Sequence, residues 1–429
     1  MTLKDKLSRV LLILLVAFSL ILSYLIWMRP ITSDPETETV STNVTQRSLK
    51  AATEVFLPAK AIWHQEDQKL LSVSENLLSL LQAELIKGDF GTLEQVGNDE
   101  QYFQEVLATQ DALELDYIGH FLLGEYVDVY SLDLNYGNEN YQKITFDRIV
   151  IDFAKNKFFA LNDDTHAVYS ADLEISSVKI KSLLKNDELH FLPVTIGHPV
   201  LQETYYVDED FSLPKYSYIL GSQPYTTFTS AFFQDPDDLS INDSGDDLLY
   251  GNEQGENLTI NNETGQVVFT TDDRNPAVVG DNLYKKSFDY VASLGVTLGN
   301  LRYFDEGSAT LTFKTFVEGY PLFSDHVRGQ LEINFSGDSL AQIMTNVQTI
   351  QIPVPSDEEV QLVKTETVLS EITEAGGDVT QITNLQIGYG WKDLKETSQV
   401  VDLMPEWFVQ YDHQWVSLSQ LMTQLEGDD

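Results

Sequence analysis

An uninterrupted apolar run near the start of the chain is the strongest constraint on what this sequence can fold into. Residues 10–27 read VLLILLVAFSLILSYLIW and carry no charged side chain. As a helix this run spans roughly 27 Å, which is enough to cross the hydrocarbon core of a bilayer. We therefore expect a transmembrane helix over residues 10–28, preceded by a short tail of residues 1–9.

The charges that flank this run predict the orientation of the helix. Lys4, Lys6 and Arg9 precede it, whereas Asp34 and Glu36 follow it. Because positive charges remain on the cytoplasmic side of a membrane, the N-terminus is expected in the cytoplasm. The bulk of the chain is then extracellular and is held at the cell membrane by a single-pass anchor.

A cleavable signal peptide is the alternative interpretation of the same run. Its apolar region usually holds about 7 to 15 residues and ends in a small-x-small cleavage site. Here the run ends in Tyr24, Trp27 and Arg29. Tyr and Trp are typical of the membrane–water interface, so this ending favours an uncleaved anchor.

The remaining length predicts several folded domains. The chain has 429 residues, of which 42% are hydrophobic, and a domain usually takes about 100 to 200 residues. Helical and strand-like periodicities follow one another, which predicts an α+β fold with helices packed on antiparallel sheets. The expected divisions are an acidic Ser/Thr-rich stalk (29–50), an N-terminal extracellular domain (51–188), a central domain (189–278) and a C-terminal domain (279–429).

Charge and cysteine content limit the compartments in which this protein can reside and the ligands that it can bind. The formal net charge is −41, so nucleic acid and anionic lipid are unsuitable ligands. The chain has no cysteine, which excludes disulfides and thiol catalysis. In an exported protein this combination favours a Gram-positive bacterium as the source.

Local patterns mark the elements of the N-terminal domain. A capping box at residues 72–75 opens a helix, and a second helix is predicted from Asn98. The first carries an apolar face of leucines, Leu77, Leu78, Leu81 and Leu85. In residues 148–153 the apolar Ile149, Ile151 and Phe153 alternate with Arg148, Val150 and Asp152. This predicts a strand with one face turned inward.

The region after residue 230 combines a polar segment with a hairpin. Residues 234–256 are crowded with Asp, Asn, Ser and Gly, which predicts a loop. Residues 258–260 and 266–270 are strand-like and are separated by a turn that ends in Gly265. They predict a β-hairpin.

The last third of the chain suggests an internal repeat. A helix is predicted over residues 284–294, and a strand pair that includes Thr310–Val317 follows it. A second helix around residues 368–372 is followed by strand-like residues 382–391 and 407–416. This order of a helix and then antiparallel strands, found twice, supports the α+β prediction.

Four segments behind the anchor carry a family likeness. They are residues 265–269 (GQVVF), 287–291 (SFDYV), 312–324 (TFKTFVEGYPLFS) and 405–415 (PEWFVQYDHQW). Together they resemble the YycH family, also called WalH. The likeness runs over most of the chain and is strongest from about residue 257 to the end.

This resemblance implies a regulator of the essential cell-wall two-component system of low-GC Gram-positive bacteria. Family members are anchored beside the sensor histidine kinase WalK (YycG), whose response regulator is WalR (YycF). They act with a second anchored protein, YycI, through contacts that include transmembrane helices. The resemblance also implies three exported domains, of which the last two are related in fold to YycI. Whether the kinase is restrained or stimulated differs between species.

One sequence pattern is suggestive of catalysis. Ser212 and Lys215 have the spacing of the S-x-x-K motif of penicillin-interacting enzymes. Pro214 makes Leu213 extended rather than helical, and the companion S-D-N and K-T-G motifs are absent from the sequence. We expect a turn here, no catalytic or cofactor-binding residue, and a protein that is not an enzyme.

Metal-binding patterns are equally weak. The seven histidines are scattered and form no H-E-x-x-H motif, and residues 163–166 (DDTH) are typical of a turn. The aspartates of residues 235–247 depart from the order of a calcium loop. No metal site and no cofactor are predicted.

Aromatic residues near the C-terminus have two interpretations. Trp391, Trp407, Tyr411 and Trp415 are either a surface for a partner or glycan, or part of a core. Their alternation within strand-like runs favours the core, and Phe313 is predicted to be buried for the same reason.

The function predicted from these features is a non-enzymatic, membrane-anchored regulator of WalK that acts with YycI. The alternative is an extracytoplasmic binding module for a cell-wall fragment or peptide, and a wall hydrolase is a weaker third. Ser19 and Ser23 lie four residues apart, on one face of the predicted membrane helix. Small and hydroxyl-bearing residues let helices approach closely in lipid, so these two serines are the candidate transmembrane contact.

Overall fold

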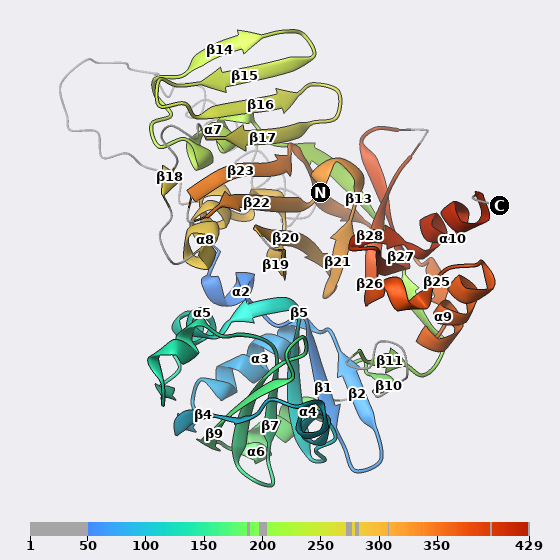
Figure 1. The fold of residues 1–429 in the computed structure, drawn as a ribbon. Coiled ribbons are helices and arrows are strands. Elements are labelled where there is room, and N and C mark those ends of the chain that lie inside the picture. Colours follow the sequence, from blue (N-terminus) through green and yellow to red (C-terminus); the bar gives the residue numbers. More distant parts are fainter. Residues whose placement is uncertain are drawn as a thin grey trace, which may run out of the picture. The chain divides into compact units, whose positions relative to one another are not determined.

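The structure is a computed structural model, and its described part forms one compact unit within Arg47–Asp429. The described residues are 50–186, 189–196, 204–271, 277–278, 283–307, 309–337, 339–394 and 397–427. They form a mixed α+β fold of helices packed on large sheets (Figure 1). The predicted tail and membrane helix, and the stalk up to residue 49, lie outside these residues. Within the described residues, no helix is long and apolar enough to span a membrane.

The first sheet is formed by residues before Asp208, and its strands are antiparallel except where β4 meets β6. In spatial order the strands are β11 (Tyr206–Val207), β10 (Leu192–Thr195), β2 (Lys69–Ser72), β1 (Lys60–His64), β5 (Ala112–Leu122), β7 (Thr145–Asp152), β8 (Lys157–Asn162), β9 (Ala167–Glu174), β4 (Thr92–Gly97) and β6 (Asn135–Tyr136), with β3 (Asp89–Phe90) paired to β9.

Helices cover both faces of this sheet. On one face lie α3 (Glu75–Leu85), α5 (Leu123–Tyr130) and α6 (Ser177–Leu184), and on the other lies α4 (Glu100–Leu107). The short α2 (Ala52–Val55) and the 3-10 helix η1 (Glu139–Lys143) complete this part. The two predicted helices are confirmed. Their N-caps are Ser74, whose Oγ accepts from the backbone N–H of Leu77, and Asp99 rather than Asn98.

The prediction that only one face of residues 148–153 is turned inward is wrong. In β7 both faces are buried, and Arg148 and Asp152 are only 4% and 1% exposed. The second face is covered because Phe103 of α4 packs in the same cluster as Val150. Alternating polarity does show which residues share a face. It does not show that the polar face meets water, because polar side chains are buried where they find partners.

The second sheet contains strands from most of the remaining chain, again mainly antiparallel, with β21 and β26 the parallel pair. In spatial order they are β14 (Ser240–Asp243), β15 (Asp247–Gly251), β16 (Asn257–Asn261), β17 (Gln266–Thr270), β23 (Ser339–Asn346), β22 (Gln330–Ser336), β20 (Thr310–Val317), β21 (Tyr320–Phe323), β26 (Ile382–Asp393), β27 (Val400–Tyr411), β13 (Tyr216–Ser222) and β24 (Gln348–Val354). Beside this path, β18 (Ala277–Val278) pairs with β23, β19 (Leu301–Glu306) with β20, and β28 (Gln414–Ser417) with β27.

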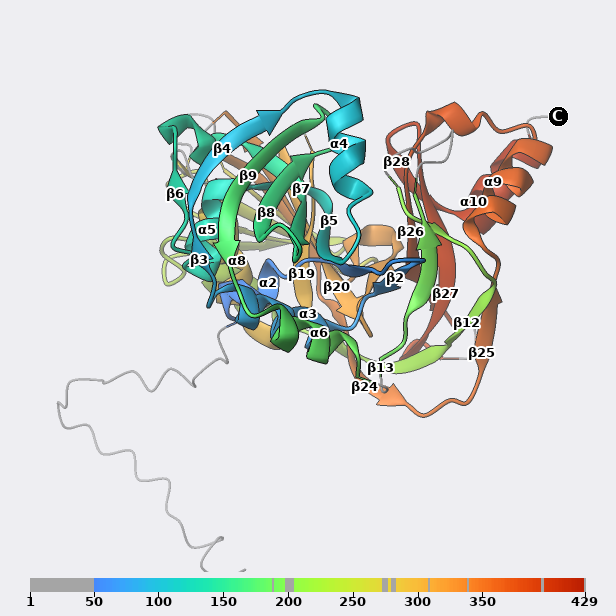
Figure 2. The same ribbon diagram turned by 90° about the horizontal axis from the view of Figure 1, so that it is seen from below.

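The helices of this part are α7 (Tyr225–Phe232), α8 (Leu283–Leu294), α9 (Thr365–Glu374) and α10 (Leu418–Gly427), with the 3-10 helices η2 (Gly295–Leu298), η3 (Asp325–Val327) and η4 (Val379–Gln381). α9 and α10 lie side by side next to β26 and β27, as Figure 1 and Figure 2 both show. The predicted β16–β17 hairpin is confirmed. So are both units of a helix and then strands, α8 with β19 and β20, and α9 with β26 and β27.

Two segments predicted as a loop and a turn are strands. Residues 234–256 contain β14 and β15, which pair with each other, and β15 also pairs with β16. The side chains of β14 are exposed. The strand can form all the same, because strand pairing uses backbone N–H and C=O groups and not apolar side chains. Residues 211–214 form β12, which pairs with β25 (Glu359–Leu362) in a separate ribbon.

The boundaries of the last strands also differ from the prediction. β27 begins at Val400 rather than near residue 407, and it ends at Tyr411. Asp412 and His413 have positive φ values of 48° and 62° and form the turn into β28. Strands from residues 189–278 and 279–429 share the second sheet, since β13 pairs with β27 and β17 with β23. The division of the exported part into three domains stays a prediction.

Candidate functional site

A bulge in the central strand β5 is the starting point of the candidate site. β5 pairs with β7 as far as Asp116 opposite Arg148, and pairing resumes at Phe121 opposite Phe146. Residues 117–120 of β5 therefore face a single residue of β7. Bulges bend a strand and re-aim side chains, and this one brings His120 beside the β7 residue that it skips, Asp147.

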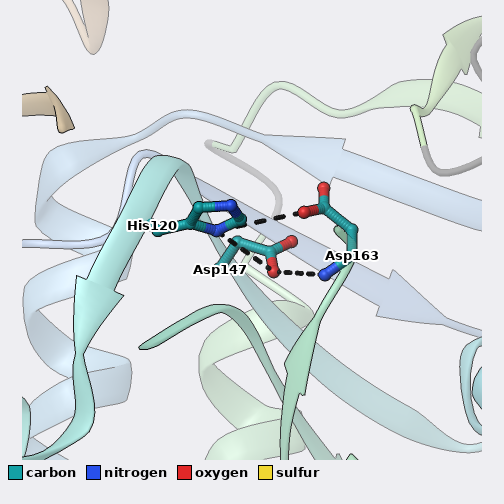
Figure 3. A group of neighbouring side chains, drawn as sticks. All are labelled: His120, Asp147 and Asp163. Carbon is teal, nitrogen blue, oxygen red and sulfur yellow. Dashed lines mark hydrogen bonds and ion pairs between the residues drawn. The ribbon is translucent and has the colours of Figure 1, made fainter. Parts of the chain in front are cut away.

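His120 contacts three aspartates, Asp147 of β7 and Asp163 and Asp164 of the β8–β9 turn, and Figure 3 shows the first two. Its Nδ1 lies 3.9 Å from Oδ1 of Asp147 and 4.0 Å from Oδ1 of Asp163, in the β8–β9 turn. Its Nε2 is 2.9 Å from Oδ2 of Asp164. The backbone N–H of Asp163 donates to Oδ1 of Asp147 over 2.9 Å. Burial, together with the nearby charge of Asp163, raises the pKa of Asp147 well above its usual value.

Arg148 contacts the same two carboxylates, those of Asp147 and Asp163, through their other oxygen atoms. Its Nε donates to Oδ2 of Asp147 over 3.1 Å, and its Nη1 donates to Oε1 of Glu114 over 3.4 Å. Its Nη2 lies 3.9 Å from Oδ2 of Asp163. Burial opposes the charge of the guanidinium, but Asp116 and the other carboxylates outweigh it and raise the pKa of Arg148 well above its usual value.

Glu114 is the centre of the same buried network. It lies 2.9 Å from Nε2 of His64, and it accepts a hydrogen bond from the hydroxyl of Tyr205 over 2.6 Å. Burial raises its pKa, but the bond from His64 and the charge of Arg148 prevail and lower the pKa of Glu114 to about 2. Burial lowers the pKa of neighbouring Lys69 to about 8. Tyr205 directly precedes β11, from which the chain continues to the second sheet. Its hydrogen bond to Glu114 therefore holds this connecting segment against the first sheet.

The bulge itself touches the second sheet. The hydroxyl of Tyr303 in β19 donates to the carbonyl of His120, and Nδ2 of Asn384 in β26 donates to the carbonyl of Ile118 over 3.4 Å. A Cβ on Gly119 would lie 2.7 Å from the Cα of Asp305, so a glycine is required there. We call residues 117–120 and these three neighbours the bulge junction.

A second junction lies at the start of α3. Arg302 of β19 is 1% exposed, and its Nη2 donates to the carbonyls of Leu57 (3.1 Å) and Pro58 (2.6 Å). Its Nη1 donates to Oε1 of Glu75 over 3.1 Å. Phe56 is buried in a core that includes residues of both sheets. The two sheets are therefore joined by buried polar and apolar contacts.

Several cavities border these junctions, among them two that are lined by residues of the second sheet. A groove of about 1060 Å³ is lined by the start of α3, residues 189–192, β12, β13 and the β20–β21 turn. A pocket of about 510 Å³ lies in the second sheet and contains Lys314. Aromatic residues line that pocket: Phe304, Phe323, Trp391, Phe408 and Trp415.

The candidate residues from the sequence have mixed outcomes. Ser19 and Ser23 lie outside the described residues, so the predicted transmembrane contact stays a prediction. Ser212 Oγ donates to Glu359 over 2.7 Å, whereas Lys215 Nζ is 2.8 Å from Asp402. The serine and lysine thus have different partners, which does not resemble a nucleophile and its base.

The aromatic residues follow the core interpretation only in part. Phe313, Trp391 and Trp407 are buried, as predicted. Tyr411 and Trp415 remain partly exposed. The turn predicted at residues 163–166 is confirmed.

No sequence pattern predicts that His120, Asp147 and Asp163 form a cluster. These residues are far apart in the sequence, and they meet because β5, β7 and β8 are adjacent in the sheet. Within the described residues, they are the group of potential metal ligands that lies closely enough together to share an ion. Recognising it from sequence requires the strand register and the bulge.

Comparison with known proteins covers nearly the whole chain. Residues 5–188 match the family model of the YycH protein, N-terminal domain, and residues 201–426 match that of the YycH protein, C-terminal domain. Among solved structures, the chain is similar to the crystal structure of YycH from Bacillus subtilis, with a TM-score of 0.69 and 16% identity. That match covers 87% of this chain and 98% of the other. At this identity the structural likeness shows the fold. No curated protein matches the sequence.

Proposed function

The chain belongs to the YycH family, as its sequence segments predicted, and on that premise we propose that it is a non-enzymatic regulator anchored beside a WalK (YycG) sensor histidine kinase. The family is one of regulators associated with the WalK/WalR system. In this proposal the chain acts together with a YycI-type anchored protein. Its domains outside the cell and its membrane helix both contribute to the control of the kinase.

The observation that carries this proposal is the extent of the family match. The N-terminal model begins at residue 5, so it includes the apolar run of residues 10–27. This supports an anchor over residues 10–28, with residues 1–9 in the cytoplasm and the bulk of the chain outside. The contact with a partner helix is proposed at Ser19 and Ser23.

The chemistry of the described residues supports a regulatory role. The buried acids and bases around Glu114 are engaged with one another, since Glu114 contacts His64, Tyr205 and Arg148. Such pairing fixes strands and junctions in place. Catalytic groups, in contrast, need a free atom aimed at a substrate.

The proposal is tested in a strain that lacks the gene, by measuring transcription from promoters that the kinase controls. Complementation with the full chain should restore the wild-type level. Replacing residues 10–27 with an unrelated anchor of equal length should reduce regulation although the protein reaches the membrane. Full regulation by the swapped chain would restrict the signal to the extracellular part. Unchanged transcription on deletion, in a strain that keeps the kinase, would exclude the regulator.

A binding module for a cell-wall fragment or peptide is the second candidate, and the groove of about 1060 Å³ favours it. The groove lies between elements of both sheets, so a ligand there would bear on their junction. The purified full chain in detergent should then bind soluble peptidoglycan fragments saturably. Tyr218→Ala, in the groove lining, should weaken that binding, and equal affinity of the variant would exclude the groove.

A further inference from the structure

We propose that His120, Asp147 and Asp163 form a binding site for one divalent transition-metal ion, of which Zn²⁺ is the first to test. The three side chains come from β5, from β7 and from the β8–β9 turn (Figure 3). Their ligand atoms, Nδ1 and two carboxylate oxygens, lie within 4.8 Å of one another. This inference concerns a site in the first sheet and is independent of the proposed role beside a kinase.

The spacing of the ligand atoms suits an ion. Nδ1 of His120 is 3.9 Å from Oδ1 of Asp147 and 4.0 Å from Oδ1 of Asp163, which is too long for a hydrogen bond. Around a tetrahedral Zn²⁺ with bonds of about 2.1 Å, two ligand atoms are about 3.4 Å apart. Side-chain rotations that shorten the two separations from Nδ1 by about 0.5 Å would bring His120 and both aspartates to this spacing.

Nδ1 of His120 is a buried nitrogen atom that has no hydrogen-bond partner among the described residues. The other nitrogen, Nε2, is 2.9 Å from Asp164. A carboxylate that binds one ring nitrogen fixes the tautomer and makes the other nitrogen a better metal ligand. Nδ1 therefore offers a lone pair to an ion, and it lies near the carboxylate oxygens of Asp147 and Asp163.

The charges around the cluster leave room for a cation. The carboxylates of Glu114, Asp116, Asp147 and Asp163 all act on Arg148, so one guanidinium faces four acids. Lys60 of β1 lies 4.0 Å from Asp116. A divalent ion would add positive charge beside Asp147 and Asp163, whose carboxylates share the guanidinium of Arg148 with Glu114 and Asp116.

Arg148 would serve as a support rather than a competitor. It binds Oδ2 of Asp147 and lies beside Oδ2 of Asp163, whereas the proposed ion uses Oδ1 of both. Hydrogen bonds to the second oxygen of a ligating carboxylate orient the first. Each aspartate would therefore join the guanidinium to the ion.

The donor set selects the class of ion. One imidazole nitrogen and two carboxylate oxygens are suitable ligands for Zn²⁺ or Mn²⁺, whereas Ca²⁺ and Mg²⁺ prefer oxygen ligands alone. Three protein ligands leave a further position for water. By binding His120, the ion would also stabilise the bulge of β5. This bulge contacts the second sheet, since the carbonyl of His120 accepts a hydrogen bond from Tyr303.

The test is calorimetric titration of the full chain, stripped with EDTA and held in detergent, with ZnCl₂, MnCl₂, MgCl₂ and CaCl₂. We expect one saturable Zn²⁺ site per chain and much weaker binding of Mg²⁺ and Ca²⁺. His120→Ala and Asp163→Asn should each weaken Zn²⁺ binding at least tenfold. Co²⁺ should bind the wild-type chain with an absorption band in the visible range that both variants lack.

Two controls separate loss of the site from loss of the fold. His413→Asn removes an exposed histidine from the β27–β28 turn, and asparagine tolerates the positive φ of that residue. It should bind Zn²⁺ as the wild type does. Asp163→Asn keeps the shape of an already partly exposed side chain, and its melting temperature without metal should match that of the wild-type chain. Absence of saturable Zn²⁺ binding, or equal affinity in His120→Ala, Asp163→Asn and wild type, would overturn the proposal.

Discussion

Each of the two sheets buries a basic side chain, and each does so in a different way. In the first sheet, Arg148 faces four carboxylates, which raise its pKa well above the usual value. In the second, Nζ of Lys314 lies 4.3 Å from the ring centre of Phe323 and 5.0 Å from that of Phe304. It donates to the amide oxygen of Gln330 over 2.6 Å. Burial lowers the pKa of Lys314 to about 7, although Glu332 and Asp305 oppose this.

The difference shows what a buried cation needs in order to stay charged. Direct carboxylate partners more than offset the loss of water around Arg148, whereas aromatic faces and one amide do not do so for Lys314. The aromatic faces do favour the ammonium form, but burial outweighs them. We therefore expect Arg148 to be needed for stability and Lys314 to be dispensable for it near neutral pH.

The largest effect is expected from Arg148→Met. This change leaves buried carboxylates, among them Glu114 and Asp147, without their cation. Removing one partner of a buried ion pair costs about 3 to 5 kcal/mol, measured as the free energy of unfolding in urea. Adding Glu114→Gln to the variant should recover part of that loss, because fewer uncompensated charges remain. A loss below about 1 kcal/mol for Arg148→Met would show that the carboxylates are protonated or that water reaches them.

Gly119→Ala tests the junction between the two regions. Asp305 faces Gly119 and also acts on the charge of Lys314. The added methyl group would lie 2.7 Å from the Cα of Asp305, so β5 and β19 must separate. Overpacking of this kind costs about 1 to 3 kcal/mol. Gly307→Ala is the matched control, because neither glycine has a positive φ and a Cβ at Gly307 would meet other atoms only at 3.8 Å or more, so it measures the added methyl group without a clash. Equal losses in the two variants would mean that the contact with Asp305 is unimportant.

Lys314→Met should change how stability depends on pH. Between about pH 7, where Lys314 loses its proton in the folded chain, and its usual pKa, the unfolded chain holds a proton that the folded chain lacks. Stability linked to this group therefore rises with pH over that window. The difference between wild type and Lys314→Met should change in that direction from pH 7 to pH 10, and at pH 7 the variant should lose no stability. A difference that is constant with pH would show that Lys314 keeps its proton when buried.

The sequence predicted elements whose signals are local. The α3 helix, the β16–β17 hairpin and the helix that ends before Gly295 depend on residues within one or two turns of each other, and all three are present. The capping box predicted at residues 72–75 is wrong, because the N-cap is Ser74 and the Glu75 carboxylate binds Asn300 and Arg302. The strands in residues 234–256 were missed because their pairing is set by backbone groups, while their side chains are those of a loop. The family was recognised because its motifs are continuous segments.

The candidate site could not be predicted in the same way. His120 reaches Asp147 and Asp163 only because β5 contains a bulge, and the position of a bulge depends on the register of the whole sheet. Burial of Arg148 likewise depends on α4 covering the second face of the first sheet. Periodicity assigns residues to faces, but what covers a face is decided by long-range packing.

The smallest effect is expected from Lys157→Ala, which isolates the role of burial in the same sheet. Lys157 pairs with Asp172 over 2.7 Å, which is shorter than the 3.1 Å between Arg148 and Asp147, but the side chains of Lys157 and Asp172 are 38% and 78% exposed. Water already solvates both charges, and exposed pairs contribute about 0 to 1 kcal/mol. Raising the salt concentration from about 0.1 M to 1 M shortens the screening length from about 10 Å to 3 Å, so the effect of Lys157→Ala should vanish there while that of Arg148→Met persists. A loss for Lys157→Ala as large as that for Arg148→Met would mean that distance, and not burial, decides how much an ion pair stabilises this sheet.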